Sequence, residues 1–152
     1  MVHIEVSHTF PVSVSEAFAY ITDIKNWPEY WPNFVRIENS SEAQWSNPGD
    51  KVAVVLKFLN RERTMSMELL EFQKDLRVIY VSRQDGLPDA HQERHFKSVP
   101  AGFEYRVIVE YQTRQGLVSL LDRLLVKGSV EKAMQKLMRN LDRGFQQRRT
   151  GA

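Results

Sequence analysis

The chain has 152 residues, 42% of them hydrophobic and 26% charged, a balance typical of a folded domain rather than a disordered or fibrous chain. The absence of Cys excludes disulfides and thiol catalysis. The formal net charge is only +2, but residues 114–152 carry nine Lys or Arg against three Asp or Glu. We expect one domain over residues 1–152. The charged N-terminal segment and the lack of an uncharged run of roughly 20 residues predict a soluble, cytoplasmic protein.

The N-terminal region predicts a strand followed by a helix. Hydrophobic residues alternate with polar ones over Val2–Phe10, which is typical of a half-buried strand. The sequence Ser13–Glu16 matches a capping box, in which Ser and Glu each bond the other's backbone amide. Apolar residues then recur at helical spacing from Ala17 to Ile24. We expect this helix to end near Asp23–Asn26, because Pro28 disfavours helical angles in the residue before it.

The middle of the chain, from Phe34 to Thr113, predicts strand after strand. Alternating apolar segments are separated by turn-forming residues, at Asn60-Arg61, Lys74-Asp75, Asp85–Pro88 and Pro100–Gly102. Short strands joined by tight turns, with no helix between them, indicate an antiparallel meander with one face in water.

The last segment, from Gly116 to about Gln147, has a helical pattern. Its apolar stripe changes direction, because Leu117–Leu125 cluster on one side and Val130–Phe145 cluster about 120° away. Gly128 lies between the two sets. One straight helix would be about 50 Å long, against roughly 40 Å for a compact domain of this size. We therefore predict a kink or break at Gly128; the alternative is one helix buried over a wide face.

Several segments resemble the polyketide cyclase/dehydrase branch of the START-like (SRPBCC) superfamily. Val12–Asp23, followed by Asn26–Pro32 (NWPEYWP), is similar to the branch's N-terminal signature, and Gly102–Tyr105 and Leu137–Phe145 are similar to its last strand entry and closing helix. The resemblance implies an α+β helix-grip fold: a curved antiparallel sheet of six to seven strands wrapped around a long C-terminal helix, with two short helices after strand one. It also implies an apolar cavity between the sheet and that helix.

Inward-facing side chains of such a fold are the candidate ligand-binding residues. The aromatic residues around the two prolines form either a lid over the cavity mouth or a plug at the sheet's end, and the methionines form either a deformable wall or ordinary core. The candidates are Trp27, Tyr30, Trp31, Phe34, Val54, Leu56, Phe58, Met65, Met67, Tyr80, Arg94, Phe96, Tyr105, Val107, Met134 and Met138.

Arg94 is the one charged member of this set. If Phe96 points inward, as the family resemblance implies, Arg94 shares its face, and a buried Arg needs a carboxylate partner or an anionic ligand group. The alternative places Arg94 near the sheet's end, in contact with solvent. The hydroxyls of Tyr80 and Tyr105 would orient a ligand or act as weak acids; plain core packing is the alternative.

No motif for nucleophilic catalysis or phosphate binding occurs, neither G-x-S-x-G nor a glycine-rich phosphate loop. His91, Glu93 and His95 share one strand face, but alternate positions place the two histidines about 13 Å apart. We expect no metal and no cofactor.

The pattern as a whole favours binding or transport of a hydrophobic small molecule: a lipid, a polyketide-like compound or an isoprenoid. The alternative is a cyclase, aromatase or dehydratase using Tyr80, Tyr105, Arg94 and Glu68, although no pair has the spacing of an acid and a base. A third hypothesis is a module that binds RNA, a ribosome or a protein. The basic C-terminal helix is either a solvated outer face or a surface that contacts anionic membranes transiently. We expect no nucleic acid partner, because basic and aromatic residues are not interleaved.

Overall fold

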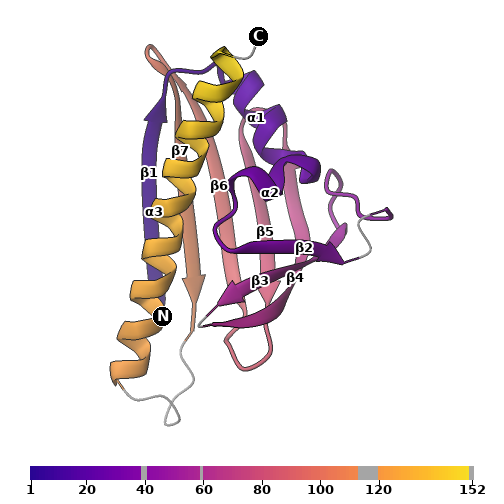
Figure 1. The fold of residues 1–152 in the computed structure, drawn as a ribbon, viewed down its shortest axis with the longest axis vertical. Helices are drawn as coiled ribbons and strands as arrows, with labels where there is room; N and C mark the ends of the chain where they lie inside the picture. The colour runs from indigo at the N-terminus through magenta and orange to yellow at the C-terminus, as the bar shows by residue number, and fades with distance from the viewer. Residues whose placement is uncertain (39–40, 59, 113–119, 151–152) are drawn as a thin grey trace.

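The structure is a computed structural model that describes residues 1–38, 41–58, 60–112 and 120–150, without the side chains of residues 58, 120–125, 149 and 150. In this part of the chain one antiparallel sheet has the strand order β1-β7-β6-β5-β4-β3-β2 (Figure 1). Its strands are β1 (Val2–Phe10), β2 (Phe34–Glu38), β3 (Lys51–Phe58), β4 (Arg61–Gln73), β5 (Arg77–Arg83), β6 (Ala90–Val99) and β7 (Gly102–Tyr111).

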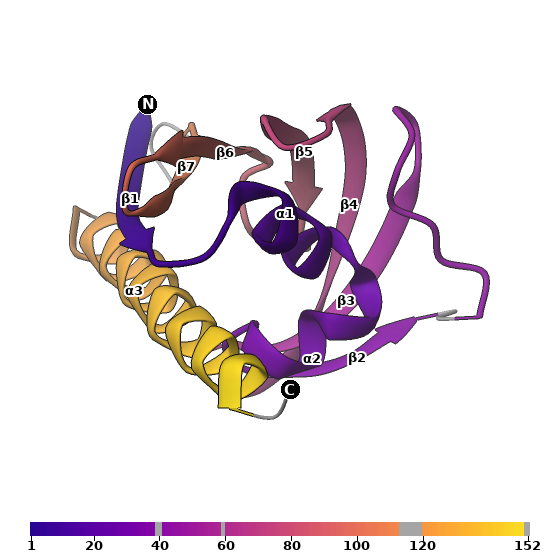
Figure 2. The same cartoon turned by 90° about the horizontal axis from the view of Figure 1, so that it is seen from above.

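The sheet is strongly curved, and helices cover its concave side (Figure 2). Two short helices after β1, α1 (Val14–Thr22) and α2 (Trp27–Tyr30), are joined by a 3-10 turn over Ile24–Asn26. The long helix α3 (Leu120–Thr150) contacts β1 on one side and α2 on the other, whereas α1 contacts β6 and β7. The predicted helix-grip fold is therefore confirmed, with seven strands.

The predicted turns lie where the strands reverse. Asn60 and Asp75 adopt positive φ values of 63°, and Gly86 and Gly102 adopt 80° and 144°. Asn, Asp and Gly are the residues that tolerate this region of backbone space at least cost. The turn chemistry of the sequence thus sets the hairpins between β3 and β4, β4 and β5, β5 and β6, and β6 and β7.

The start of α1 confirms half of the predicted capping box. The amide of Glu16 donates to the side-chain oxygen of Ser13 at 3.3 Å, whereas no return bond from the Ser13 amide to Glu16 occurs among the described hydrogen bonds. The helix ends at Thr22, close to the expected position. The expected effect of Pro28 is wrong: Trp27 is helical, at φ −56° and ψ −39°. Pro28 lies in the first turn of α2, where a missing amide hydrogen costs nothing.

The predicted kink or break at Gly128 is wrong, because α3 continues without interruption from Leu120 to Thr150. Its 31 residues correspond to about 46 Å, and the molecule is elongated along this helix (Figure 1). The breadth of a compact domain therefore does not limit the length of α3. The first part of the predicted helix, 116–119, and the side chains of the first apolar set lie outside the described residues. No helix in the described part of the chain is long and apolar enough to cross a membrane.

Replacing Gly128 with Ala is expected to raise the free energy of unfolding by about 0.5–1 kcal/mol, measured by urea denaturation. A Cβ at this position meets nothing within 4 Å, so only the favourable change in backbone entropy remains. Gly144 in the same helix is the control, since its added Cβ would lie 2.9 Å from the Tyr20 hydroxyl. A loss of stability in Gly128→Ala would contradict an uninterrupted α3.

The two ends of the concave side are filled differently. Near α1 and the C-terminal end of α3, aromatic rings pack edge to face and in stacks: the Phe10 ring centroid lies 5.4 Å from that of Phe103 and 5.3 Å from that of Phe145. Phe96 extends this cluster toward Phe18, with ring centroids 4.9 Å apart. Such packing closes this end and leaves the N-terminal half of α3 to face the rest of the sheet.

Candidate ligand-binding site

A pocket of about 160 Å³ lies between the concave face of the sheet and α3. It extends from Arg94 in the middle of β6 to the loop between β5 and β6, where Leu87 and Pro88 are partly exposed. Arg94 lies four positions after Ala90, which starts the strand, and this spacing corresponds to about 13 Å of depth. The pocket thus occupies the part of the core that α1 does not fill.

The wall of the pocket is mostly apolar. Every strand from β3 to β7 contributes, as do the segment after α2 and one face of α3. The described lining contains no Asp, Glu or His. It consists of Trp31, Pro32, Leu56, Met65, Tyr80, Ser82, Gln84, Leu87, Pro88, Ala90, Gln92, Arg94, Val109, Tyr111, Val126, Val130, Ala133, Met134 and Leu137.

Polar side chains of β5 and β6 form one connected network in this wall. Tyr80 and Gln92 are directly opposite in the β5–β6 ladder, and the Tyr80 hydroxyl donates to Gln92 Oε1 at 2.9 Å. Gln92 Nε2 donates to Ser82 Oγ at 2.8 Å. Arg94 Nη2 donates to both the Tyr80 hydroxyl and Gln92 Oε1, each at 2.8 Å. The network lines the pocket and positions several donors on one side of it.

Arg94 is buried, with 8% of its surface exposed, so the alternative of a solvent-exposed Arg94 at the sheet's end is wrong. Its guanidinium also lies over the Tyr80 ring, 5.3 Å from the centroid. Burial raises the pKa of both Tyr80 and Tyr105, and the Arg94 charge only partly opposes this effect. Both tyrosines are therefore neutral at physiological pH, able to donate a hydrogen bond but weak as acids.

Behind Arg94 lies a second, smaller pocket of about 30 Å³. Trp31, Tyr80, Arg94 and Leu137 line both pockets. Most of the predicted aromatic cluster surrounds the smaller one. Its walls include Trp27, Tyr30, Met67, Phe96 and Tyr105.

Within the aromatic cluster, Trp27 and Tyr30 are buried and bonded to the main chain. Their side chains each donate to the backbone oxygen of Ile21. Trp31 stacks on Trp27 with ring centroids 4.7 Å apart and borders both pockets. Trp45, which is not among the predicted site residues, joins the cluster, with its ring centroid 5.8 Å from that of Trp27. Trp27 and Tyr30 thus pack as a plug, and Trp31 is the member that contacts the larger pocket.

The remaining predicted residues lie in different places. Leu56, Met65 and Met134 line the larger pocket. Val54, Val107 and Met138 are buried in the core and line neither of the two pockets, and Phe34 is only partly buried, against Trp31. Phe58 belongs to β3, but its side chain lies outside the described residues.

Sequence reasoning missed several lining residues that strand alternation can identify. Ser82 shares a face with Tyr80, and Val109 and Tyr111 share a face with Tyr105. The Tyr111 hydroxyl is buried and has no hydrogen-bond partner in the part of the chain that the structure describes. A polar atom in this state at a pocket wall is suited to a guest molecule or a water.

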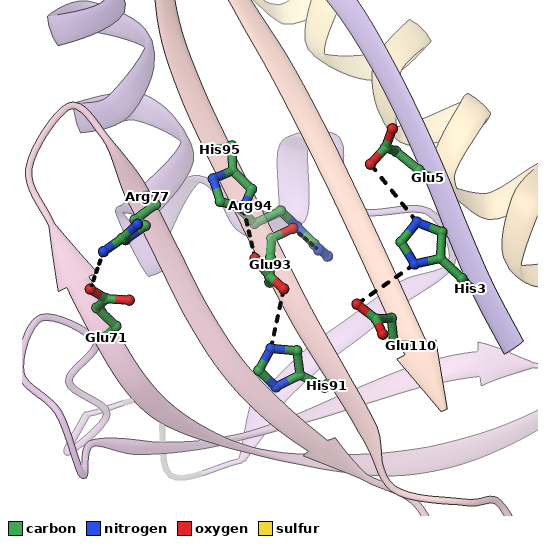
Figure 3. Close-up of polar contacts among 9 residues, drawn as sticks. All are labelled: His3, Glu5, Glu71, Arg77, His91, Glu93, Arg94, His95 and Glu110. Carbon is green, nitrogen blue, oxygen red and sulfur yellow. Dashed lines mark hydrogen bonds and ion pairs between the residues drawn. The ribbon is translucent and has the colours of Figure 1, made fainter. Parts of the chain in front are cut away.

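The convex face of the sheet carries a separate group of ion pairs (Figure 3). The Glu93 carboxylate lies 2.7 Å from His95 Nε2 and 3.3 Å from His91 Nε2. The hydrogen bond with His95 lowers the pKa of Glu93. Among the described residues, no group of three or more His, Asp or Glu is arranged to hold a metal ion. Glu68, considered as a catalytic acid, also lies on this face, 3.8 Å from Arg83, and does not reach the pocket.

The outer face of α3 carries the predicted basic stripe. Lys132, Lys136, Arg139 and Arg143 are exposed and recur at helical spacing, opposite the side that lines the pocket. Contact of this stripe with an anionic membrane stays a prediction.

A curved antiparallel sheet closed by a long C-terminal helix defines this chain as a helix-grip protein of the START-like (SRPBCC) superfamily. It belongs to the family described as polyketide cyclase/dehydrase and lipid transport, whose model matches residues 1–146. A search of curated protein sequences finds no match.

Solved structures with this fold share little sequence with the chain. The protein TTHA0849 from Thermus thermophilus is 14% identical with a TM-score of 0.77, over 93% of this chain and 95% of that one. A protein from Rhodobacter sphaeroides is 16% identical with a TM-score of 0.74, over 94% and 91% of the two chains. DynU16, a protein of the dynemicin biosynthetic locus, is 14% identical with a TM-score of 0.68, over 93% of this chain and 48% of its own. At these identities the comparisons establish the fold alone.

Proposed function

We propose that this chain binds a hydrophobic small molecule in the pocket between the sheet and α3. The observation that carries the proposal is a pocket of about 160 Å³ beside a closely packed aromatic core. Protein interiors contain few voids larger than a water molecule, and a void of about 150 Å³ accepts a guest the size of benzene. The volume favours a short chain or a single ring over an entire phospholipid.

The chemistry of the wall supports the same proposal. Apolar surface of the guest would leave water for contact with residues such as Leu56, Met65 and Met134, at about 25 cal/mol per Å². The polar network of Tyr80, Gln92 and Arg94 would fix the orientation of the guest. A mostly apolar wall with a few convergent polar groups is typical of small-molecule sites.

Binding is favoured over catalysis, because the described lining offers no base. It contains no carboxylate and no imidazole, and burial raises the pKa of the Tyr80 and Tyr105 hydroxyls. General acid–base catalysis needs a group whose pKa lies near the operating pH. Binding of an apolar guest is common to both activities in the family description.

The test is calorimetric titration with straight-chain alcohols and carboxylates of six to twelve carbons. We expect binding to the wild type and at least tenfold weaker binding to Ala133→Phe, whose larger side chain fills the pocket. Gln135→Phe is the matched control, because it adds the same ring on the exposed side of α3. Failure of every probe to bind the wild type, or equal affinity for both variants, would overturn the proposal.

A further inference from the structure

Arg94 is a buried cation whose partners are all neutral. Its Nη2 donates to the Tyr80 hydroxyl and to Gln92 Oε1, and its Nη1 donates to the backbone oxygen of Glu93 at 3.2 Å. The residue is 8% exposed. A guanidinium stays protonated in proteins, so this positive charge lies in the interior with hydrogen bonds but without an opposite charge.

The nearest carboxylate in the sequence does not supply that charge. Figure 3 shows the Glu93 carboxylate directed to His91 and His95 on the convex face, away from the Arg94 guanidinium. Within the described ranges, Arg94 takes part in no ion pair. Tyr80 and Tyr105 remain neutral, since burial raises the pKa of both.

The hydrogen bonds among Tyr80, Gln92 and Ser82 do not depend on Arg94. Tyr80 already donates to Gln92, and Gln92 already donates to Ser82, so each of the three side chains has a partner when the guanidinium is removed. A structural role in holding Tyr80 and Gln92 is therefore a weak reason to retain a buried charge. Apolar residues of similar size replace buried ionic groups without loss of stability in many proteins.

The position of the Arg94 guanidinium in the pocket indicates a role in binding. Arg94 lines the inner part of the larger pocket, where that pocket adjoins the smaller one. Toward the β5–β6 loop the wall is mostly apolar, with Leu87, Pro88, Val126 and Val130, and its polar groups there are Gln84 and the Tyr111 hydroxyl. The site thus has a cationic inner end and a mostly apolar outer end.

We propose that the ligand is an anionic amphiphile, a monocarboxylate whose carboxylate is bound at Arg94 and whose apolar chain extends toward the β5–β6 loop. This inference rests on the proposed function, and it names the chemical class of the guest. The carboxylate would accept hydrogen bonds from N–H groups of the guanidinium and supply the missing negative charge. A charged hydrogen bond inside a low-dielectric pocket discriminates strongly against a neutral head group.

Octanoate and 1-octanol, which differ only in the head group, test the proposal by calorimetry at pH 7.5. We expect the wild type to bind octanoate at least tenfold more tightly than octanol. Arg94→Met should bind octanol as the wild type does and lose the preference for octanoate. Arg106→Met removes the same charge from an exposed position on β7 and should keep the preference.

The other outcomes separate the two proposals. Equal affinity of the wild type for the two probes, or a preference that survives in Arg94→Met, overturns the inference and leaves the proposed function intact. Failure of both probes to bind, together with every other alcohol and carboxylate of six to twelve carbons, overturns the proposed function. Tighter binding of octyl phosphate than of octanoate overturns the assignment of a carboxylate.

A titration of pH on the wild type needs no substitution and so remains decisive if Arg94→Met does not fold. The pKa of octanoic acid lies close to that of an ordinary carboxyl side chain, about 4.3. As the pH falls from 7.5 to 4, about two thirds of the free probe takes up a proton, so its preference over octanol should fall about threefold. An unchanged preference at pH 4 would contradict a charge-dependent site.

Discussion

Replacing Gly102 with Ala is expected to lower the free energy of unfolding by more than about 3 kcal/mol. Gly102 begins β7 at a φ of 144°, and a Cβ at this position would lie 2.0 Å from the backbone oxygen of Phe10. It would also lie 2.8 Å from the backbone nitrogen of Val12. These atoms belong to the chain as it leaves β1, so the clash can be relieved only by moving backbone.

The matched control is Gly86→Ala, in the loop between β5 and β6. Gly86 also has a positive φ, of 80°, but an added Cβ meets nothing within 4 Å. Gly86→Ala should therefore lower the free energy of unfolding by only about 1 kcal/mol, through backbone strain alone. Urea denaturation of both variants measures the difference. Equal midpoints would show that the β6–β7 turn does not approach β1 as closely as the structure indicates.

This close approach matters for the site, because it fixes the closed end of the molecule. Phe10 and Phe103 stack beside the turn, with ring centroids 5.4 Å apart, and Phe145 of α3 packs against both. With this end filled by rings, the space between α3 and the sheet is left toward the β5–β6 loop. The position of the pocket therefore depends on side chains that do not line it.

The strands of the sheet could be predicted from the sequence, because strands and turns depend on residues that lie close together along the chain. Alternation over Val2–Phe10 and Phe103–Tyr111 determines which side chains face inward, and the residues at Asn60, Asp75 and Gly86 determine where the chain reverses. The resemblance to a known family then predicted how the sheet packs against the C-terminal helix.

The helices were predicted less completely, because their ends depend on neighbours. Pro28 predicts the end of a helix, yet it lies in the first turn of α2, where its missing amide hydrogen removes no helical hydrogen bond. Gly128 is a residue type that weakens helices, yet a Cβ added there would meet nothing within 4 Å, and Val126 and Val130 on either side line the pocket. Neither fact is encoded in residue spacing.

The site shows the same limit. Alternation places Arg94 on the inner face with Phe96, but only the fold shows that the middle of β6 is covered, so that Arg94 is buried. The partners Gln92 and Ser82 follow from the β5–β6 register rather than from any motif. Arg94 is buried for two reasons: local alternation directs it to the inner face, and elements distant in sequence cover that part of β6.

Met134 and Leu141 lie on the same face of α3, seven residues or two helical turns apart, and should respond differently to truncation. Leu141 is fully buried in the core, whereas Met134 is partly buried and lines the pocket. Leu141→Ala should lower the free energy of unfolding by about 2–5 kcal/mol, because it leaves a new cavity. Met134→Ala should cost about 1 kcal/mol, because its side chain already borders empty space.

The same pair separates stability from binding. Met134→Ala enlarges the pocket, so its affinity for a ten-carbon carboxylate relative to an eight-carbon one should rise above that of the wild type. Leu141→Ala should leave this ratio unchanged, because Leu141 does not line the described pocket. Urea denaturation and calorimetry measure the two effects. Equal costs for the two substitutions, together with unchanged chain-length preference, would mean that α3 packs uniformly against the sheet and that no space remains for a guest.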